Sequence, residues 1–324
     1  MADSLFNYTK FASEFSMKEK REARYATHLP FTAGEKIEYW FLRVSFGAVS
    51  RLPFRILYGI SDFMAWLADD VVHYRRKIVE ENLRSSLPAL SESEIKDTRR
   101  KFYRFLTDYF VETVKMGHMS GERMKRHMRF ENIDEVSEHL RDGRNVTLLL
   151  GHYCNWEWVS SLPLHFPENV ECGQIYHVLH NRAADKMFLR LRSHYGATSI
   201  PMEETLRRLI KWQREGKASV VGYIADQSPK PNSIHYWLDF LHHDTPVFTG
   251  PERISRKLKC AVYYLDMHRE KRGYYSGKFV RISEDASQEP ENRIIREYFG
   301  MLQKTIEDCP PYWLWSHRRW KRHR

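Results

Sequence analysis

The stretch "NVTLLLGHYCNWEWV", residues 145–159, joins a short apolar run to a histidine and, five residues later, a glutamate. Residues 146–150 have the length and the apolar character of a buried strand. On a regular helix, residues five apart are rotated by about 140° and do not share a face. His152 and Glu157 can therefore meet only if His152 lies in the turn between this strand and a following helix.

Downstream of this stretch, short β-rich runs alternate with helical patterns. The strand-like runs cover residues 170–178, 198–201, 218–226 and 260–267, and helical patterns begin near residues 155, 182, 202 and 251. Such alternation is typical of a mostly parallel sheet flanked by helices. We therefore expect an α/β fold over residues 126–324, ending in a basic and aromatic segment.

Two polar residues, His152 and Asp226, directly follow strand-like runs. Ligands of parallel sheets bind at the carboxyl ends of the strands. A carboxylate at Glu157 that accepts from one ring nitrogen of His152 would leave the other nitrogen as a base toward a hydroxyl. Two alternatives stay open: a histidine–glutamate pair with only a structural role, and an Asx turn at Asp226.

Other reaction chemistries have weaker support in the sequence. There is no G-x-S-x-G motif for a serine hydrolase, and Cys154 is an alternative nucleophile only through its closeness to His152 in sequence. The histidines at 177, 180, 242 and 243 lack the H-E-x-x-H spacing of a metal site. We expect no metal and no cofactor.

The N-terminal part has a different character. Residues 1–34 are polar and are expected to form a mobile extension, and residues 35–125 a helical region. Within it, residues 37–72 are apolar and aromatic but are interrupted by three arginines and Asp62, which disfavours a membrane-spanning helix. We expect amphipathic helices, broken near Pro53, that lie on a membrane surface; a pair of core-packing helices is the alternative. The arginines 43, 51 and 55 would lie at headgroup depth, and the aromatic residues Trp40, Phe41, Phe46, Phe54 and Trp66 would enter the acyl boundary.

The net charge of +10 favours anionic partners, which include nucleic acid, anionic lipid and acidic proteins. The segment "YWLWSHRRWKRHR", residues 312–324, suits an anionic interface or an acidic protein. We do not expect nucleic-acid binding, because no recognised nucleic-acid-binding motif accompanies the basic residues. The four cysteines show no C-x-x-C spacing and are interpreted as reduced thiols.

The "GHYCNWEW" stretch resembles the H-x4-(D/E) block of the glycerolipid acyltransferase superfamily. Further blocks in the same order resemble the lipid A biosynthesis (late, lauroyl/myristoyl-type) acyltransferase family: "RRKIVEENL" (75–83), "FLRLRS" (188–193), "YIADQSP" (223–229), "FTGPERISRK" (248–257) and "PYWLWSHRRWK" (311–321). The resemblance extends from about residue 37 to the C-terminus.

The resemblance implies an O-acyltransferase that moves a fatty acyl chain from acyl carrier protein to a hydroxyl of a lipid A precursor. It implies His152 as general base, Glu157 as its orienting partner, and roles at the substrate for Asp226 and for Arg190, with Arg192 as the near alternative. Thr249 and Gly250 open a helix whose N-terminus could bind an oxyanion or phosphate. The implied location is the cytoplasmic face of the bacterial inner membrane, peripheral or monotopic.

Two features depart from the family pattern. Family members usually begin with an apolar spanning helix, whereas this chain has a polar extension followed by a segment that arginines interrupt. In addition, Glu252 stands where the family tends to have a small residue, and it would lie either in the acceptor pocket or facing solvent. Rival functions are acylation of another membrane lipid, such as a lysophospholipid or an aminoacyl lipid, and non-catalytic lipid binding.

Overall fold

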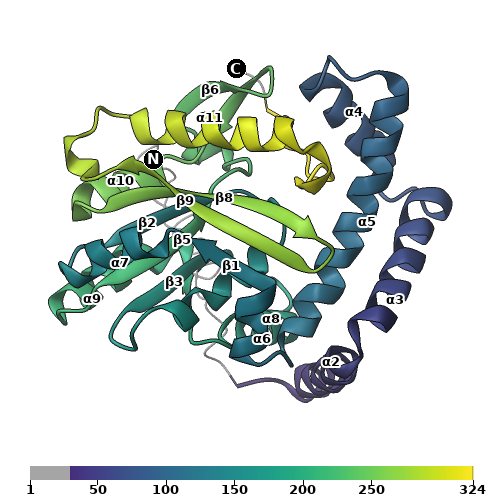
Figure 1. Cartoon of the computed structure of the whole chain (residues 1–324), viewed down its shortest axis with the longest axis horizontal. Helices are drawn as coiled ribbons and strands as arrows, with labels where there is room; N and C mark the ends of the chain where they lie inside the picture. The colour runs from purple at the N-terminus through teal and green to yellow at the C-terminus, as the bar shows by residue number, and fades with distance from the viewer. Residues whose placement is uncertain (1–29, 323) are drawn as a thin grey trace, which may run out of the picture.

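The centre of the molecule is a seven-stranded sheet with the order β1-β9-β8-β2-β5-β3-β4 (Figure 1). The computed structural model describes residues 30–322 and 324. All neighbouring strands in this sheet are parallel except β8 and β9. Their bounds are β1 Met128–Glu131, β2 Val146–Leu150, β3 Glu171–Tyr176, β4 Thr198–Pro201, β5 Ser219–Ile224, β8 Ala261–Lys271 and β9 Tyr274–Ser283. The expected α/β fold with a mostly parallel sheet is confirmed.

Strand β2 is central and all five of its residues are buried. It lies between β5 and β8, with Leu150 opposite Ile224 and Leu149 opposite Tyr264. A strand covered on both faces reads as a continuous apolar run, and the sequence "VTLLL" has this property. The site residues that follow β2 are therefore anchored to a fully buried strand in the middle of the sheet.

Helices connect the strands and flank the sheet (Figure 1). The α-helices of this part are α7 Ile133–Arg141, α8 Arg182–Arg192, α9 Thr205–Arg214, α10 Gly250–Leu258 and α11 Arg293–Asp308. Short 3₁₀ helices are η3 Trp156–His165, η4 Met202–Glu204, η5 Pro231–Ser233, η6 Ala286–Gln288 and η7 Pro310–Tyr312. A separate antiparallel hairpin consists of β6 Tyr236–Phe240 and β7 His243–Val247.

The N-terminal region is helical, as expected. It contains α2 Ala33–Arg51, α3 Phe54–Trp66, the π-helical turn η2 Leu67–Val71, α4 Arg76–Ser86, α5 Glu92–Met116 and α6 Gly121–His127. Pro53 separates α2 from α3, and capping boxes at Thr32 and Ser91 open α2 and α5. The long helix α5 runs between α3 and the α/β part (Figure 1). Most of the expected N-terminal extension, residues 1–29, lies outside the described residues.

The helical region and the sheet share one hydrophobic core. Phe102 and Phe105 of α5 belong to the same buried cluster as Leu148 and Leu149 of β2. The two N-terminal helices α2 and α3 pack one face against α5 and α8 and leave another face open. Phe46 and Phe54, expected at the membrane, are half-buried against this core. Among the described helices, none combines the length and the apolar character that crossing a membrane requires.

Candidate active site

His152 lies in the turn between β2 and η3, as the spacing argument required. Gly151, just before it, passes close to α11: a Cβ at this position would be 2.7 Å from Leu302 Cδ1. Any larger residue would have to displace the buried Leu302 side chain, so glycine suits the point where the chain leaves β2. The His152 side chain is 18% exposed, so the ring is mostly enclosed but reachable.

Asp226 binds His152 from the neighbouring strand. The Nδ1 atom of His152 is 2.6 Å from Asp226 Oδ1, and the backbone N–H of His152 donates to Oδ2 at 2.9 Å. The register explains the pairing: Leu150 is opposite Ile224, so the residues two positions further along each strand emerge side by side. Both residues were expected at the carboxyl edge of the sheet, and the structure brings them together.

The prediction that His152 contacts Glu157 is wrong, because each has another partner. Glu157 lies in the first turn of the 3₁₀ helix η3 and is buried. Its carboxylate accepts two hydrogen bonds from Arg192, at 2.7 Å from Nε and 2.5 Å from Nη2, and one from the Tyr109 hydroxyl at 3.3 Å. The physical reason is that a carboxylate this deeply buried needs a charged partner, and the end of α8 supplies it.

Charge fixes the tautomer of His152. Burial alone would raise the pKa of Asp226, but the nearby His152 and the hydrogen bonds from His152 and Trp313 hold that pKa at about 2. An ionised Asp226 accepts a hydrogen bond from the protonated Nδ1, which leaves Nε2 as the basic nitrogen. The side-chain amide of Gln227 is 3.1 Å from Nε2, and an amide N–H there donates to it.

Of the two candidate arginines, Arg192 faces the site. Arg190 is exposed, whereas the Arg192 side chain is 23% exposed and is held by Glu157. Burial would lower the pKa of the Arg192 guanidinium, but the hydrogen bonds and charge of Glu157 keep it above its ordinary value. A bidentate arginine of this kind presents its remaining N–H donors in a fixed direction.

Trp156 joins the two polar pairs. Its ring stacks on Tyr109 with centroids 4.1 Å apart and meets the His152 ring edge-on at 5.1 Å. Trp158 is fully buried, and its Nε1 donates to the backbone carbonyl of Glu112. Trp158 is therefore a packing residue, while Trp156 contacts both the His152 ring and Tyr109, the tyrosine that donates to Glu157.

Thr249 and Gly250 open α10, as expected for helix-starting residues. The described contacts do not connect either residue with His152, and the Thr249 side chain makes no capping hydrogen bond. Glu252 neither lines a pocket nor faces solvent: its buried carboxylate accepts from the backbone N–H groups of Asn292 and Ile295 and so caps α11. Helix capping accounts for the glutamate at this position.

Cys154 does not have the environment of a nucleophile. It is fully buried, and burial raises the pKa of its thiol well above the ordinary value. A thiol that stays protonated is a poor nucleophile. The described residues also contain no cluster of three or more histidine, cysteine, aspartate or glutamate side chains with the geometry to hold a metal ion.

The sequence argument missed two partners of the dyad, Gln227 and Trp313, and the hydroxyl of Tyr109. Gln227 could have been found, because it directly follows Asp226 at the strand end. Trp313 and Tyr109 lie far away in sequence, and nothing local to His152 signals them.

The fold and the site define an α/β protein with a buried histidine–aspartate pair at the carboxyl end of parallel strands and an arginine–glutamate pair beside it. The chain belongs to the family described as bacterial lipid A biosynthesis acyltransferase, whose model matches residues 32–322. It is also similar to the lipid A biosynthesis lauroyltransferase of Escherichia coli (strain K12), with 22% identity over 294 residues, covering 87% of this chain and 92% of that protein. The expected family is confirmed.

Proposed function

We propose that the protein transfers a fatty acyl chain from acyl carrier protein to a hydroxyl of a lipid A precursor. The observation that carries this proposal is the His152–Asp226 pair, placed at the carboxyl end of parallel strands in a chain of this family. The pair has the arrangement of a general base and its orienting carboxylate, and a thioester donor is already activated for attack.

In the proposed reaction, Nε2 of His152 accepts the proton of the acceptor hydroxyl while the hydroxyl oxygen attacks the thioester carbonyl. The C–O bond forms, the tetrahedral intermediate collapses, and the C–S bond breaks. The leaving thiolate takes the proton back from His152, which returns the ring to its starting state. Asp226 holds the ring orientation throughout and stabilises its protonated form.

Arg192 is proposed to bind a phosphate group of a substrate. Its guanidinium is held by Glu157, whose carboxylate also accepts from Tyr109, and Trp156 packs against both Tyr109 and the His152 ring. Arginine is well suited to phosphate because its planar N–H donors match the phosphate oxygens. Glu157, on this proposal, acts through Arg192 and not through His152.

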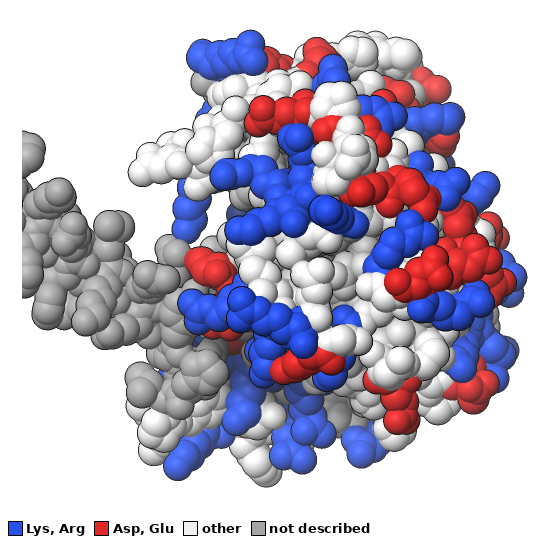
Figure 2. Space-filling view, turned by 90° about the vertical axis from the view of Figure 1, so that its left-hand side faces the viewer, with Lys and Arg blue, Asp and Glu red and all other residues white. Residues whose placement is uncertain are grey.

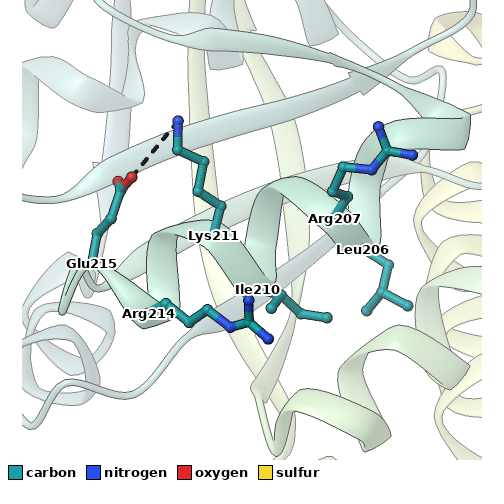
Figure 3. A pocket seen from close by; sticks show the side chains of 6 residues that line it. All are labelled: Leu206, Arg207, Ile210, Lys211, Arg214 and Glu215. Carbon is teal, nitrogen blue, oxygen red and sulfur yellow. Dashed lines mark ion pairs between the residues drawn. The ribbon is translucent and has the colours of Figure 1, made fainter.

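The acyl carrier protein is proposed as donor because the surface is basic in places that an acidic protein could contact. A shallow groove of about 510 Å³ runs along α9, where Leu206 and Ile210 are flanked by Arg207, Lys211 and Arg214 (Figure 3). Lys and Arg side chains also gather on the face of the molecule on which α7, α9 and α10 lie (Figure 2). Complementary charge would speed the encounter with an acidic carrier.

The membrane contact is proposed to be the outer face of α2 and α3, which lie at the periphery of the molecule (Figure 1). Ile37, Trp40, Phe41 and Val44 form a stripe at helical spacing on α2, and they are 49–70% exposed. Helix α3 continues it with Ile56, Ile60 and Phe63, which are 40–59% exposed. An apolar patch of this extent marks an interaction site. Docking by this face would hold the enzyme on the cytoplasmic face of the inner membrane.

The test is a reconstituted reaction. Purified protein is incubated with labelled acyl-acyl carrier protein and a lipid A precursor, and the product lipid is identified by mass spectrometry. His152→Ala should lose at least a thousandfold in product formation, because it removes the base, while its binding to lipid vesicles is retained. Undiminished turnover in this variant would overturn the proposed role of His152.

The same reaction separates the rivals. In parallel reactions, a lysophospholipid or an aminoacyl lipid replaces the acceptor, or acyl-coenzyme A replaces the donor. The rate of product formation is compared between these reactions. Faster product from one of these than from the lipid A precursor with acyl carrier protein would reassign the substrate. Vesicle binding without any product would support the non-catalytic alternative.

A further inference from the structure

The C-terminal segment passes directly over the turn that carries His152. The backbone N–H of Cys154 donates to the carbonyl of Tyr312 at 2.9 Å, and Tyr153 forms an antiparallel bridge with Trp313. Tyr153 also donates from its hydroxyl to the carbonyl of Cys309 at 2.8 Å. Two of these contacts attach the start of the segment that the sequence suggested as an interface to the active-site turn, and the third attaches Cys309 just before it.

Trp313 extends from this segment to Asp226. Its Nε1 donates to Asp226 Oδ2 at 2.8 Å, the same oxygen that accepts from the His152 backbone N–H. The other oxygen, Oδ1, is thereby left to the His152 ring. With hydrogen bonds on both oxygens, the carboxylate cannot rotate about its last bond without losing at least two of them.

The indole itself has no freedom to move. Trp313 is 2% exposed and meets the rings of Trp315 and Phe240 edge-on, with centroids 4.8 and 5.9 Å apart. A donor held between two packed rings is preorganised, so it positions its acceptor at little entropic cost. Asp226, 1% exposed, has few other ways to satisfy its charge.

We propose that Trp313 is a positioning residue of the acyl-transfer reaction: its indole N–H fixes the Asp226 carboxylate so that Oδ1 orients the His152 ring. The inference rests on the proposed function, because the reaction needs an oriented base. It also assigns the C-terminal segment to the active site, since residues 312–313 close over the His152 turn and complete the hydrogen bonds of its partner.

The chain offers a matched control. Trp315 lies two residues further along in the same segment, is also fully buried, and donates from Nε1 to the carbonyl of Pro310 at 2.6 Å. Phenylalanine at either position keeps an aromatic ring and removes an N–H. The two variants therefore carry a similar packing loss, and only Trp313→Phe removes a bond to Asp226.

The first experiment measures kcat and KM for both variants in the acyl-transfer reaction. Trp313→Phe should lower kcat about ten- to a hundredfold with KM within twofold of the wild type, the size of effect that outer hydrogen-bond partners have at other sites. Trp315→Phe should keep kcat within about threefold. Equal kcat in the two variants, or a loss in both that follows their melting temperatures, would overturn the proposal.

The second experiment does not depend on substrate. In protein labelled with ¹⁵N-tryptophan, the Trp313 indole N–H resonance is assigned by its absence in Trp313→Phe. In Asp226→Asn this resonance should move upfield, because a bond to a charged acceptor is lost, while the Trp315 resonance stays in place. A Trp313 resonance that does not move in Asp226→Asn would refute the hydrogen bond between Trp313 and Asp226. A wild type without product in any donor and acceptor combination would instead refute the proposed function.

Discussion

At the scale of single residues, the site separates the two carboxylates that the sequence places near His152. Asp226 contacts the ring, and Glu157 contacts Arg192. If this division holds in the reaction, the two isosteric amide substitutions have different kinetic effects. Asp226→Asn removes the charge that fixes the tautomer, while Glu157→Gln loosens Arg192 and leaves the base oriented.

We expect Asp226→Asn to lower kcat by about 10³- to 10⁴-fold, the loss known for the equivalent change in a serine protease triad. Glu157→Gln should mainly raise KM for the phosphate-bearing substrate, by about tenfold, because bidentate fixation of Arg192 is lost. Steady-state kinetics of both variants, with melting temperatures as the folding control, measure the difference. A kcat collapse in Glu157→Gln with near-normal kcat in Asp226→Asn would reverse the assignment.

At the scale of elements, some features of the N-terminal helices were predicted correctly from the sequence and others were not. The break at Pro53 is a local signal and is confirmed, and the capping box at Ser91, which opens α5, depends on local residues as well. The expected membrane face mixed residues of two kinds: Trp40, Phe41 and Trp66 are exposed, whereas Phe46 and Phe54 pack inward. Hydrophobicity alone cannot tell which apolar side chains of such a helix meet the protein and which stay exposed.

The vesicle test follows from the outer stripe of α2 and α3. The double variant Phe41→Glu/Phe63→Glu puts two charges on it and should reduce flotation with anionic vesicles at least fivefold, because charged side chains resist the acyl boundary. The control, Leu179→Glu/Met202→Glu, adds the same charge at exposed apolar residues outside these helices and should float normally. Equal flotation of both doubles would remove α2 and α3 as the membrane surface.

The strand neighbours explain why the dyad was only half predictable. The sequence placed His152 and Asp226 at strand ends, but which strands are adjacent depends on long-range packing. Strand β5 lies beside β2 although β3 and β4 come between them in the chain. With that adjacency known, the pairing of His152 with Asp226 follows from register. The antiparallel β9 and the arrival of Trp313 likewise have no local signal.

At the scale of the whole molecule, α5 connects the proposed membrane surface with the site. Its Tyr109 donates to Glu157, and its Glu112 accepts from Asn155, the residue that caps η3. Glu112 also accepts from Tyr58 of α3 and Tyr275 of β9. One buried carboxyl group therefore joins the N-terminal helices, the His152 loop and the sheet, which makes the helical region structurally continuous with the candidate active site.

Glu112 makes this connection dependent on pH. Burial, together with the charge of Asp108, raises the pKa of Glu112 from 4.5 to about 7. In the unfolded chain the group ionises near its ordinary value, so the folded state binds the extra proton between these two pH values. The contribution of Glu112 to the free energy of unfolding should then be highest below about pH 4.5 and fall, by up to about 3 kcal/mol, as pH rises to 7. The buried His317, whose pKa is lowered to about 4, contributes in the opposite direction, so the difference between wild type and variant isolates Glu112.

Glu112→Gln should remove this contribution, because its amide does not titrate, whatever it does to stability at a single pH. Urea unfolding of the wild type and the variant between pH 4.5 and 8 measures the two slopes. Glu138→Gln, at an exposed position on α7, is the matched control and should keep the wild-type slope. If Glu112→Gln keeps that slope as well, the Glu112 carboxyl is ionised throughout this pH range. The contacts that it makes through α5 would then not depend on pH.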